Sequence, residues 1–488
     1  MRLNRAAILA LPLLVGALGS CSSRGEESSV QGDVFAVFTG ELEQGCEIKV
    51  LENDTAIANG YFQELLNAFN EAYAPYGVKA VDANIGEYSD LATMGPYGTG
   101  PDVLYQANDV IMKYVDQQHV RPLPVDKLEA YEYLSDTAKD AYHANVGGED
   151  YYFGVPINVQ SGLLYYRKDL LPENWETEWD DDKDGVPDMV ENLNDLYAYT
   201  RMLYEDSDDE SFGFVFSPND FYFSSGFLLT YGGYIFGPDG TDTYDIGLGA
   251  NDAALGAQVV LDFAEVMPKD CYDDTAKAAL SGYLASGRYF CSVTTPDVHS
   301  TMVSALAKTY QGEDSSLTDE EAEAKAEENI VAVTFPSFPK DGDVTAPAES
   351  SQQVDSIMMG GINGYAMSSY TKYPNASLAF INFATSYEMV KLREEILDIA
   401  PCRSDVAEDS DSDLTHELFE KIDSGSIFVM PSVSAISQVW SPTASFFEDL
   451  VRDPARDASE KKYDSLEKIE AELNRTSQTI YDAIHTLS

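Results

Sequence analysis

Twelve consecutive residues, 180–191, place oxygen-bearing side chains at the spacing of a calcium-binding loop. The segment reads DDDKDGVPDMVE and fits the pattern D-x-D-x-[DN]-G-x5-E, with the glycine that permits a sharp turn at its sixth position. Calcium takes about six to eight oxygen ligands. The spacing therefore predicts one structural Ca²⁺ site whose ligands are Asp180, Asp182, Asp184, the carbonyl of Val186, Asp188 and Glu191.

A solvated acidic turn is the alternative interpretation of residues 180–191, because clusters of Asp arise easily in a chain this acidic. The preceding segment 172–179 (PENWETEW) is only weakly helical, so an entering helix of the EF-hand kind is not predicted. We expect an isolated loop with a structural role rather than one of a pair of calcium-sensing hands.

Catalytic motifs are missing from the sequence. It contains no G-x-S-x-G, no H-E-x-x-H and no GxxxxGK[ST], and no two of its five histidines stand at metal-ligand spacing. Carboxylates are so frequent that no single pair can be assigned as the acid and base of a glycosidase. We therefore expect a protein that is not an enzyme.

The first twenty residues have the layout of a secretory signal. Two arginines precede an apolar run over residues 6–18, which is too short to cross a bilayer of about 30 Å. The string LGSC at 18–21 resembles the bacterial lipobox, which predicts a lipid anchor on Cys21 at the outer face of the cytoplasmic membrane. Ordinary cleavage that leaves Cys21 as a thiol is the alternative. Residues 21–32 predict a flexible tether.

The overall composition limits the partners. The chain has 488 residues, 44% of them hydrophobic, and a formal net charge of −54. The hydrophobic fraction is sufficient for packed cores, and the length suggests several domains of about 100–200 residues each. Such a charge argues against nucleic acid and against docking on anionic lipid, since both require clustered Lys and Arg. It leaves neutral ligands and cations open.

Four cysteines follow Cys21. An even number in an exported protein permits two disulfides, in three possible connectivities. Four free buried thiols are the alternative, and the sequence does not choose between them. The four residues are Cys46, Cys271, Cys291 and Cys402.

The apolar pattern predicts helices and strands that alternate along the whole chain. Residues 61–73 (YFQELLNAFNEAY) have apolar side chains at helical spacing, and 189–204, 253–266 and 434–450 are further predicted helices. Residues 47–52 and 103–105 are predicted strands. This alternation indicates α/β domains with mainly parallel sheets.

Five strings carry a family resemblance, and their order and spacing cover residues from about 46 to 484. They are GPDVLYQAND (100–109), YYFGVPINVQSGLLYYRKDLLP (151–172), YGGYIF (231–236), GGINGYAM (360–367) and MPSVSAISQVW (430–440). Through them the chain resembles the extracellular solute-binding proteins of ABC importers, in the maltose/maltodextrin-binding branch. The resemblance implies a monomeric, lipid-anchored receptor that captures a carbohydrate and delivers it to the importer's permease subunits.

The resemblance also implies a type II periplasmic-binding-protein fold, with two α/β lobes that close on a ligand in the cleft between them. Residues 33–157 and 357–405 would form the N-terminal lobe, and 158–356 and 410–488 the C-terminal lobe. Within this division the implied disulfides are Cys46–Cys402 and Cys271–Cys291, because a bridge between lobes would oppose the hinge motion.

The family's ligand contacts can be carried over position by position. Asp54, Asp109 and Asp220 match carboxylates that bind sugar hydroxyls, and Tyr222 and Trp440 match aromatic residues that stack on the sugar. Gln106 stands where the family has a stacking Trp, Gln160 replaces a ligand-binding Glu, and Glu87 matches another polar contact. A pyranose offers an apolar face for aromatic rings and a rim of hydroxyls for carboxylates, so these residue types suit an oligosaccharide.

Several alternatives remain at this stage. Trp440 and Tyr222 also fit core positions, and Asp54 and Asp109 also fit helix caps. The acidic composition favours, as a second function, a receptor of the same fold for a cationic or peptide ligand. A surface lipoprotein that acts on glycans or mediates adhesion is a third.

Overall fold

The strand β14 (Met358–Ser368) organises the larger of the two main sheets. It is buried along its whole length, and its sequence MMGGINGYAMS lacks the apolar–polar alternation of a half-exposed strand because both of its faces are covered. The sheet has seven strands in the order β15-β14-β3-β1-β2, with β4 and β7 also paired to β14. The other six strands are β1 (Glu47–Leu51), β2 (Lys79–Asp82), β3 (Val103–Ala107), β4 (Val120–Arg121), β7 (Gly154–Ser161) and β15 (Ile427–Val429).

The second main sheet has four strands in the order β11-β8-β10-β9. Two short hairpins, β5–β6 and β12–β13, lie outside both sheets. The strands of the second sheet are β8 (Leu163–Arg167), β9 (Phe212–Phe214), β10 (Tyr289–Thr294) and β11 (Ile330–Thr334). The hairpin strands are β5 (His143–Val146), β6 (Glu149–Tyr152), β12 (Phe338–Pro339) and β13 (Gln353–Val354).

The prediction of mainly parallel sheets is wrong. The pairs β1–β2, β1–β3, β14–β15 and β9–β10 are parallel, but β14 is antiparallel to β3, β4 and β7, and β8 is antiparallel to β10 and β11. The cause is the way in which the chain passes between the two sheets. A single residue separates β7 from β8, so no crossover helix intervenes, and β14 returns in the opposite direction.

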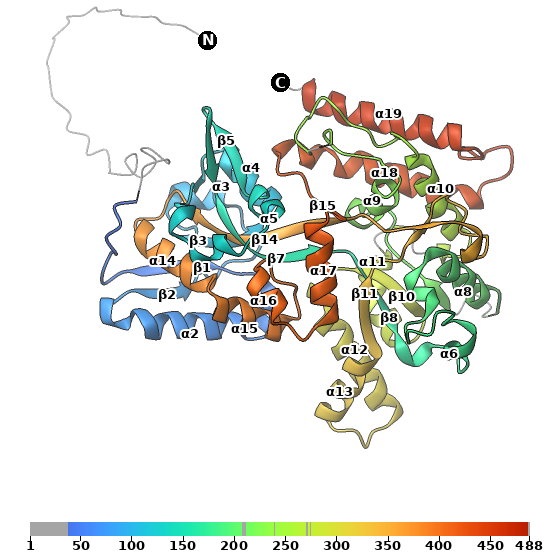
Figure 1. Cartoon of the computed structure of the whole chain (residues 1–488), viewed down its shortest axis with the longest axis horizontal. Coiled ribbons are helices and arrows are strands. Elements are labelled where there is room, and N and C mark those ends of the chain that lie inside the picture. The colour runs from blue at the N-terminus through green and yellow to red at the C-terminus, as the bar shows by residue number, and fades with distance from the viewer. Residues whose placement is uncertain (1–37, 207–210, 239, 270–271, 274, 487–488) are drawn as a thin grey trace, which may run out of the picture.

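The computed structural model describes residues 38–206, 211–238, 240–269, 272–273 and 275–486, and the two sheets form the centres of two lobes that lie side by side (Figure 1). Around the first sheet lie α1 (Asp54–Ala58), α2 (Tyr61–Tyr73), α3 (Leu91–Met94), α4 (Asn108–Asp116), α5 (Asp136–Asp140), α14 (Pro374–Ala384), α15 (Tyr387–Leu397) and α16 (Ser404–Glu408). Around the second lie α6 (Trp175–Glu178), α7 (Asp188–Glu191), α8 (Leu193–Asp206), α9 (Phe221–Leu229), α10 (Ala253–Ala264), α11 (Thr275–Ala285), α12 (His299–Glu313), α13 (Asp319–Asn329), α18 (Trp440–Val451) and α19 (Leu466–His485).

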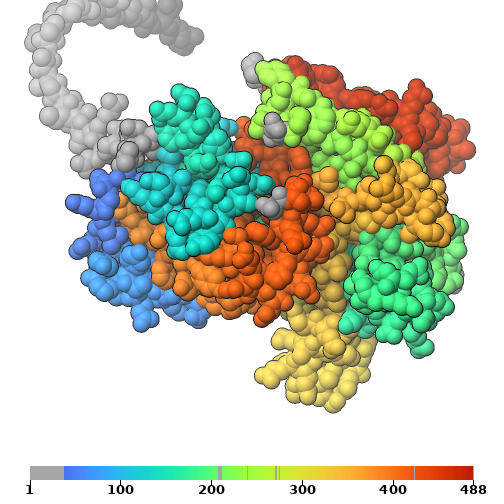
Figure 2. All heavy atoms as spheres, in the orientation of Figure 1, coloured from blue at the N-terminus to red at the C-terminus, as the bar shows by residue number. Residues whose placement is uncertain are grey.

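The boundary between the lobes differs from the predicted division in two places. The division puts 158–161 in the C-terminal lobe, but these residues continue β7 in the first sheet. It also puts 410–488 in the C-terminal lobe, but β15 pairs in parallel with the start of β14 in the first sheet. The helix α17 (Asp413–Asp423) precedes β15 and reaches the second lobe, where Thr334 of β11 donates to Glu417 at 2.6 Å. In Figure 2 the helices α12 and α13, coloured yellow, protrude from the second lobe.

Two of the predicted helices are interrupted. The one at 434–450 is a 3₁₀ turn over Ser434–Gln438 followed by α18. The predicted helix at 61–73 coincides with α2. The helix predicted at 189–204 is divided into α7 and α8 by Asn192, whose backbone is extended and whose side chain accepts a hydrogen bond from the N–H of Asp195 at 2.9 Å. An Asn that caps the next helix in this way favours a break in the chain direction.

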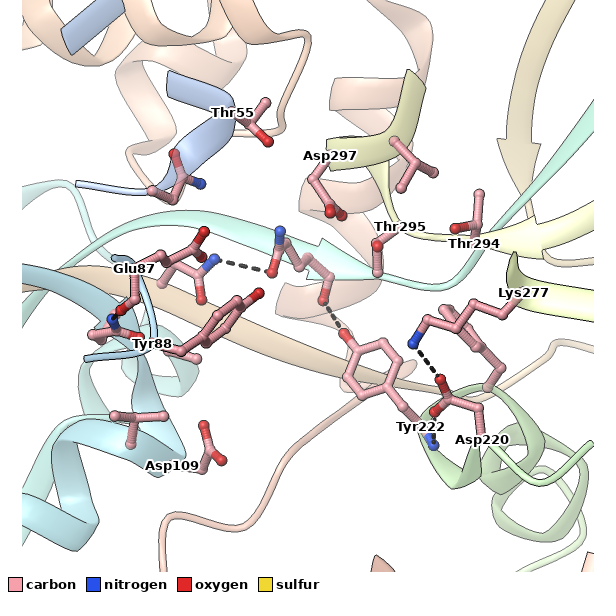
Figure 3. A pocket seen from close by; sticks show the side chains of 18 of the residues that line it. Thr55, Glu87, Tyr88, Asp109, Asp220, Tyr222, Lys277, Thr294, Thr295 and Asp297 are labelled. Atoms are coloured by element: carbon pink, nitrogen blue, oxygen red, sulfur yellow. Dashed lines mark hydrogen bonds and ion pairs between the residues drawn. The ribbon is translucent and has the colours of Figure 1, made fainter. Parts of the chain in front are cut away.

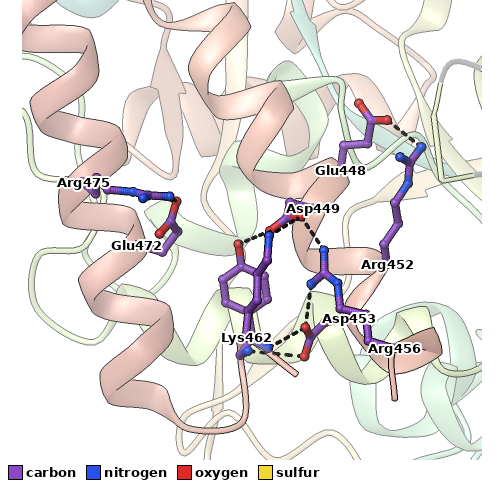
Figure 4. Close-up of polar contacts among 9 residues, drawn as sticks. Glu448, Asp449, Arg452, Asp453, Arg456, Lys462, Glu472 and Arg475 are labelled. Atoms are coloured by element: carbon purple, nitrogen blue, oxygen red, sulfur yellow. Dashed lines mark hydrogen bonds and ion pairs between the residues drawn. The ribbon is translucent and has the colours of Figure 1, made fainter. Parts of the chain in front are cut away.

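A network of ion pairs stabilises the connection between α18 and α19 (Figure 4). Lys462 lies 2.9 Å from Asp449, and Arg456 lies 2.6 Å from Asp453 and also pairs with Asp449. Asp453 is buried and accepts the backbone N–H of Lys462 at 2.8 Å. The network therefore holds the segment that leads into α19 against the end of α18.

No helix among the described residues is long and apolar enough to cross a membrane. The predicted signal at 1–20, the tether at 21–32 and Cys21 lie outside the described residues.

Candidate ligand-binding site

The first lobe presents polar side chains where β1 and β3 end. These strands are parallel neighbours, so their carboxyl ends meet at one edge of the sheet, the usual place for a ligand in an α/β fold. After β1, Asn53 caps α1 by accepting the N–H of Ala56 at 2.9 Å. After β3, α4 follows at once and carries Asp109 in its first turn.

A loop before α3 completes this side of the site. The side chain of Gln106 donates to the backbone carbonyl of Glu87 at 2.7 Å, and the carboxylate of Glu87 accepts the N–H of Asp54 at 3.1 Å. The next residue, Tyr88, is 88% exposed. The loop is thus held against β3 and α1 while the ring of Tyr88 stays free of protein packing.

The second lobe contributes the start of α9 and the segment after β10. Asp220 caps α9 by accepting the N–H of Tyr222 at 3.2 Å, and its other carboxylate oxygen lies 2.7 Å from the ammonium of Lys277 on α11. Asp297 lies in the short turn that follows β10. Figure 3 shows these side chains opposite those of the first lobe.

The strands that cross between the lobes form the floor of the site. Asn363 of β14 donates to the side-chain carbonyl of Gln160 on β7 at 3.0 Å. The hydroxyl of Tyr222 donates to the backbone carbonyl of Gln160, also at 3.0 Å. Because the hydroxyl is used in this way, the ring of Tyr222 is held at a defined position beside the crossing strand (Figure 3).

These elements enclose a cavity of about 530 Å³. Small-molecule pockets usually have volumes of about 300–1,000 Å³. Among the residues that the structure describes, four carboxylates line the cavity, from Glu87, Asp109, Asp220 and Asp297, and the cation of Lys277 is paired with one of them. The cavity is therefore rich in hydrogen-bond acceptors and negatively charged.

Burial shifts the titration of two of these acids. It raises the pKa of the Asp109 carboxyl above its ordinary value. It also raises the pKa of the Glu87 carboxyl, with a further contribution from the nearby charges of Asp54 and Asp297. Both groups are partly removed from water. A carboxylate in such surroundings is stabilised most by hydrogen-bond donors that a ligand supplies.

Six of the eight predicted ligand contacts line this cavity: Glu87, Gln106, Asp109, Gln160, Asp220 and Tyr222. Asp54 and Trp440 are not among its lining residues. Asp54 is exposed at the start of α1, between two residues that do line the cavity. Trp440 is half-buried at the start of α18, where its ring lies 6.4 Å from that of Phe221. A role for these two residues in ligand contact stays a prediction.

The structure adds lining residues that sequence reasoning did not identify. Tyr88 follows the predicted Glu87 in a Gly86–Ser89 turn, and an aromatic residue within the short polar segment GEYSD was the available signal. Lys277 and Asn363 had no local signal, because their helix and strand reach the site only through the packing of distant segments.

The arrangement suits a neutral polyhydroxylated ligand. Carboxylates and amides accept hydrogen bonds from adjacent hydroxyls, and the rings of Tyr88 and Tyr222 can cover an apolar sugar face. The predicted calcium ligands lie elsewhere, on α7 and the loop before it, and they do not line this cavity.

The predicted disulfide Cys46–Cys402 is wrong, since both residues are buried free thiols. Cys46 precedes β1 at the end of the sheet away from the cavity, whereas the N–H of Cys402 bonds to Ile157 on the crossing strand at 2.7 Å. A disulfide needs Cα atoms within about 7 Å, and opposite ends of a sheet do not allow this. Cys291 is also a buried free thiol, so the pair with Cys271 is not formed, and Cys271 lies outside the described residues.

Comparison with known proteins supports the architecture and the family. The maltodextrin-binding protein MdxE of Bacillus subtilis is 24% identical over 450 residues, which cover 91% of each chain. The galactooligosaccharide-binding protein of the same organism is 28% identical over 224 residues, or 45% of this chain and 48% of that protein. The structure of MalX from Streptococcus pneumoniae in complex with maltopentaose has a TM-score of 0.65 at 21% identity and covers 89% of this chain and 100% of that one.

The likeness to MalX confirms the expected two-lobed α/β fold. A family model described as "Bacterial extracellular solute-binding protein" matches residues 64–419, which is most of the chain. The family resemblance inferred from the sequence is therefore confirmed: the chain belongs to the bacterial extracellular solute-binding proteins.

Proposed function

We propose that this protein captures an oligosaccharide of the maltodextrin class in the cavity between its lobes and delivers it to an ABC importer. The observation that carries the proposal is the convergence of Asp109 and Glu87 from one lobe with Asp220 and Tyr222 from the other. The names of its relatives, which bind maltodextrins or galactooligosaccharides, support the same class of ligand.

Two geometric features favour an oligosaccharide over a single sugar. The volume of about 530 Å³ accommodates more than one ring, and the cavity is open at the side of Tyr88. An exposed aromatic ring at the rim can stack on a further residue of the chain. Binding would then draw the lobes together, because the ligand contacts both.

Isothermal titration calorimetry with a panel of ligands tests the proposal. We expect maltotriose and maltopentaose to bind. Galactooligosaccharides should bind with lower affinity, and spermidine should give no heat of binding. A saturating ligand at 100 times its Kd should also raise the unfolding free energy by about 2.7 kcal/mol. Binding of none of the oligosaccharides at millimolar concentration would contradict the proposal.

A cationic ligand is the second candidate, and the charge of the cavity favours it. Four carboxylates face one lysine, and that lysine is already paired with Asp220. Binding of spermidine or a basic peptide, with no response to oligosaccharides, would establish this alternative. Loss of that binding at high salt would separate it further from sugar capture, since uncharged hydroxyls are little affected by screening.

We also propose that the exported protein is held at the membrane by a lipid on Cys21. The support is the apolar run followed by Gly19, Ser20 and Cys21. Expression in a bacterium fed with labelled palmitate should label the protein, and Cys21→Ala should abolish the label and release the protein from the membrane fraction. Equal labelling of the variant would contradict the anchor.

Transport tests the last step, delivery to the permease subunits. Cells that lack this protein should lose uptake of the radiolabelled oligosaccharide, and the intact gene should restore it. The Cys21→Ala variant should restore uptake only partly, because it diffuses away from the importer. Size-exclusion chromatography with light scattering should show a monomer.

A further inference from the structure

The loop at 180–191 brings three carboxylates together. One oxygen from each of Asp180, Asp182 and Asp184 lies within 4.8 Å of the others. The N–H of Asp184 bonds to Asp182 at 3.2 Å, and the N–H of Val186 bonds to Asp184 at 2.8 Å, so the chain curls around these side chains. Gly185 has a φ of +88°, a conformation that favours glycine.

A second and independent observation points to a bound cation. Asp180 is only 7% exposed, and its Oδ1 is buried without any hydrogen-bond partner. A buried carboxylate oxygen that lacks a partner is strongly unfavourable. Among the described residues no ion pair joins any of the three aspartates to a Lys, Arg or His side chain. A cation at the point where the three carboxylates converge would satisfy the orphaned oxygen.

The end of the loop is held in position to complete such a site. The backbone carbonyl of Glu191 accepts both the N–H and the hydroxyl of Ser337, at 2.8 Å and 3.0 Å. Asp188 accepts the N–H of Asp181 at 3.1 Å, which draws α7 toward the loop.

We propose that residues 180–191 bind one Ca²⁺ ion, with ligands from Asp180, Asp182, Asp184, the Val186 carbonyl and Glu191, and with Asp188 bound directly or through a water. All of these ligands are oxygens, which suits a hard cation and not the metals that prefer Cys or His. Calcium tolerates six to eight ligands in flexible geometry (about 2.3–2.6 Å), whereas Mg²⁺ demands a near-ideal octahedron. The loop supplies about the number of oxygens that calcium requires.

The position of the loop indicates what the ion does. The loop leads into α8, which packs on β9 of the second sheet, and Trp179 just before the loop lies edge-on to Tyr199 of α8 at 5.6 Å. None of the proposed calcium ligands lines the ligand cavity. The ion therefore stabilises the second lobe and leaves the sugar contacts unchanged.

Terbium luminescence tests the site in the purified protein. Tb³⁺ replaces Ca²⁺ at oxygen sites, and the indole of Trp179, adjacent to the first ligand, should sensitise its emission. We expect emission that saturates at one ion per chain and that Ca²⁺ displaces at lower concentration than Mg²⁺. Calorimetry with CaCl₂ should give the same stoichiometry, and EDTA should lower the melting temperature without changing the affinity for the oligosaccharide.

Asp184→Asn should weaken calcium binding at least tenfold and remove the effect of EDTA on the melting temperature. Asp341→Asn is the matched control, because Asp341 also accepts a backbone N–H two residues further on, in an exposed turn that contains only one other Asp. The control should bind calcium like the original protein. Equal binding by Asp184→Asn, or no calcium binding by the original protein at millimolar concentration, would overturn the proposal.

Discussion

Asp109 shows how one side chain combines a structural and a binding role. It lies in the first turn of α4, where the unpaired N–H groups of the helix favour a negative charge. Burial acts in the opposite direction and raises the pKa of its carboxyl. A ligand hydroxyl that donates to this carboxylate would favour the charged form, so ligand binding and ionisation should support each other.

We expect Asp109→Asn to reduce oligosaccharide affinity roughly 10- to 100-fold, since a hydrogen bond to a charged group contributes about 1.5–3 kcal/mol.

The affinity of the original protein should also fall with acidification. The fall should begin at a higher pH than for an ordinary carboxyl, because the pKa values of Asp109 and Glu87 are both raised. Titration calorimetry between pH 7 and pH 4 measures both effects. Asp116→Asn, at the exposed end of the same helix, should bind normally.

The same two carboxyls should change the stability of the ligand-free protein in the opposite direction to the affinity. A carboxyl whose pKa is raised by folding binds more protons in the folded state, so its contribution to stability increases as the pH falls through the window between the two pKa values. The ligand-free protein should gain stability from Glu87 and Asp109 in the same range in which affinity is lost. If the oligosaccharide affinity of the original protein and of the Asp109→Asn variant did not change with pH, a role for these carboxylates would be contradicted.

Tyr88 is expected to stack on the ligand at the rim of the cavity. Tyr88→Ala should weaken oligosaccharide binding about tenfold, with a larger effect on maltopentaose than on maltose, because only the longer chain reaches the rim. Tyr97→Ala is a matched control, since Tyr97 is 83% exposed in the same lobe and does not line the cavity. Equal losses for both variants would show that Tyr88 has no specific contact.

The end of β1 is supported by a buried ion pair beneath the site. Glu52 and Arg393 of α15 are almost fully buried and lie 2.8 Å apart, and the hydroxyl of Tyr365 on β14 also bonds to Glu52. The guanidinium of Arg393 lies over the rings of Tyr61 and Tyr105, at 4.8 Å and 4.1 Å. The pair therefore joins β1, β3, β14, α2 and α15 directly below Asn53.

Removal of one partner of this pair should be strongly destabilising. Glu52→Gln leaves the charge of Arg393 buried without a carboxylate and should lower the free energy of unfolding by about 3–5 kcal/mol in urea denaturation. The exposed pair Glu47–Lys79 provides the control, and Glu47→Gln should cost about 0–1 kcal/mol. A loss below 1 kcal/mol for Glu52→Gln would show that the buried pair does not stabilise the lobe.

The two lobes are joined by few segments, chiefly the β7–β8 connection and the start of β14. The ligand cavity lies across this junction and is lined from both sides. Because the net charge is −54, the lobes repel each other at low salt, and a neutral ligand that contacts both would oppose that repulsion. The whole molecule is thus suited to a hinge that closes on its ligand.

Small-angle X-ray scattering should detect this closure. Saturating maltopentaose should reduce the radius of gyration, and Asp109→Asn at the same sugar concentration should show a smaller reduction because fewer molecules are occupied. An unchanged scattering profile at a concentration that calorimetry shows to be saturating would exclude a large hinge motion.

Information that lies within short stretches of sequence was sufficient for much of this description. The helix α2 follows from the spacing of its apolar residues, and the acidic loop at 180–191 follows from residues that are neighbours in the chain. The five family strings indicated the two-lobed fold, and six of the eight carried-over contacts line the cavity. The helix and the loop follow from local patterns because their interactions span only a few residues, whereas the fold and the cavity contacts follow from the family resemblance.

Contacts between distant residues required the folded chain. The directions of the strands depended on the crossing between lobes, and the cysteines assigned to one lobe proved to lie at opposite ends of its sheet. Tyr88 and Asp297 line the same cavity, and Lys277 pairs with Asp220. In each case the two residues are more than fifty positions apart in the chain. Such contacts depend on sheet register and helix packing, which a linear pattern does not encode, so only the tertiary structure brings Glu87, Asp109, Asp220 and Asp297 to one cavity.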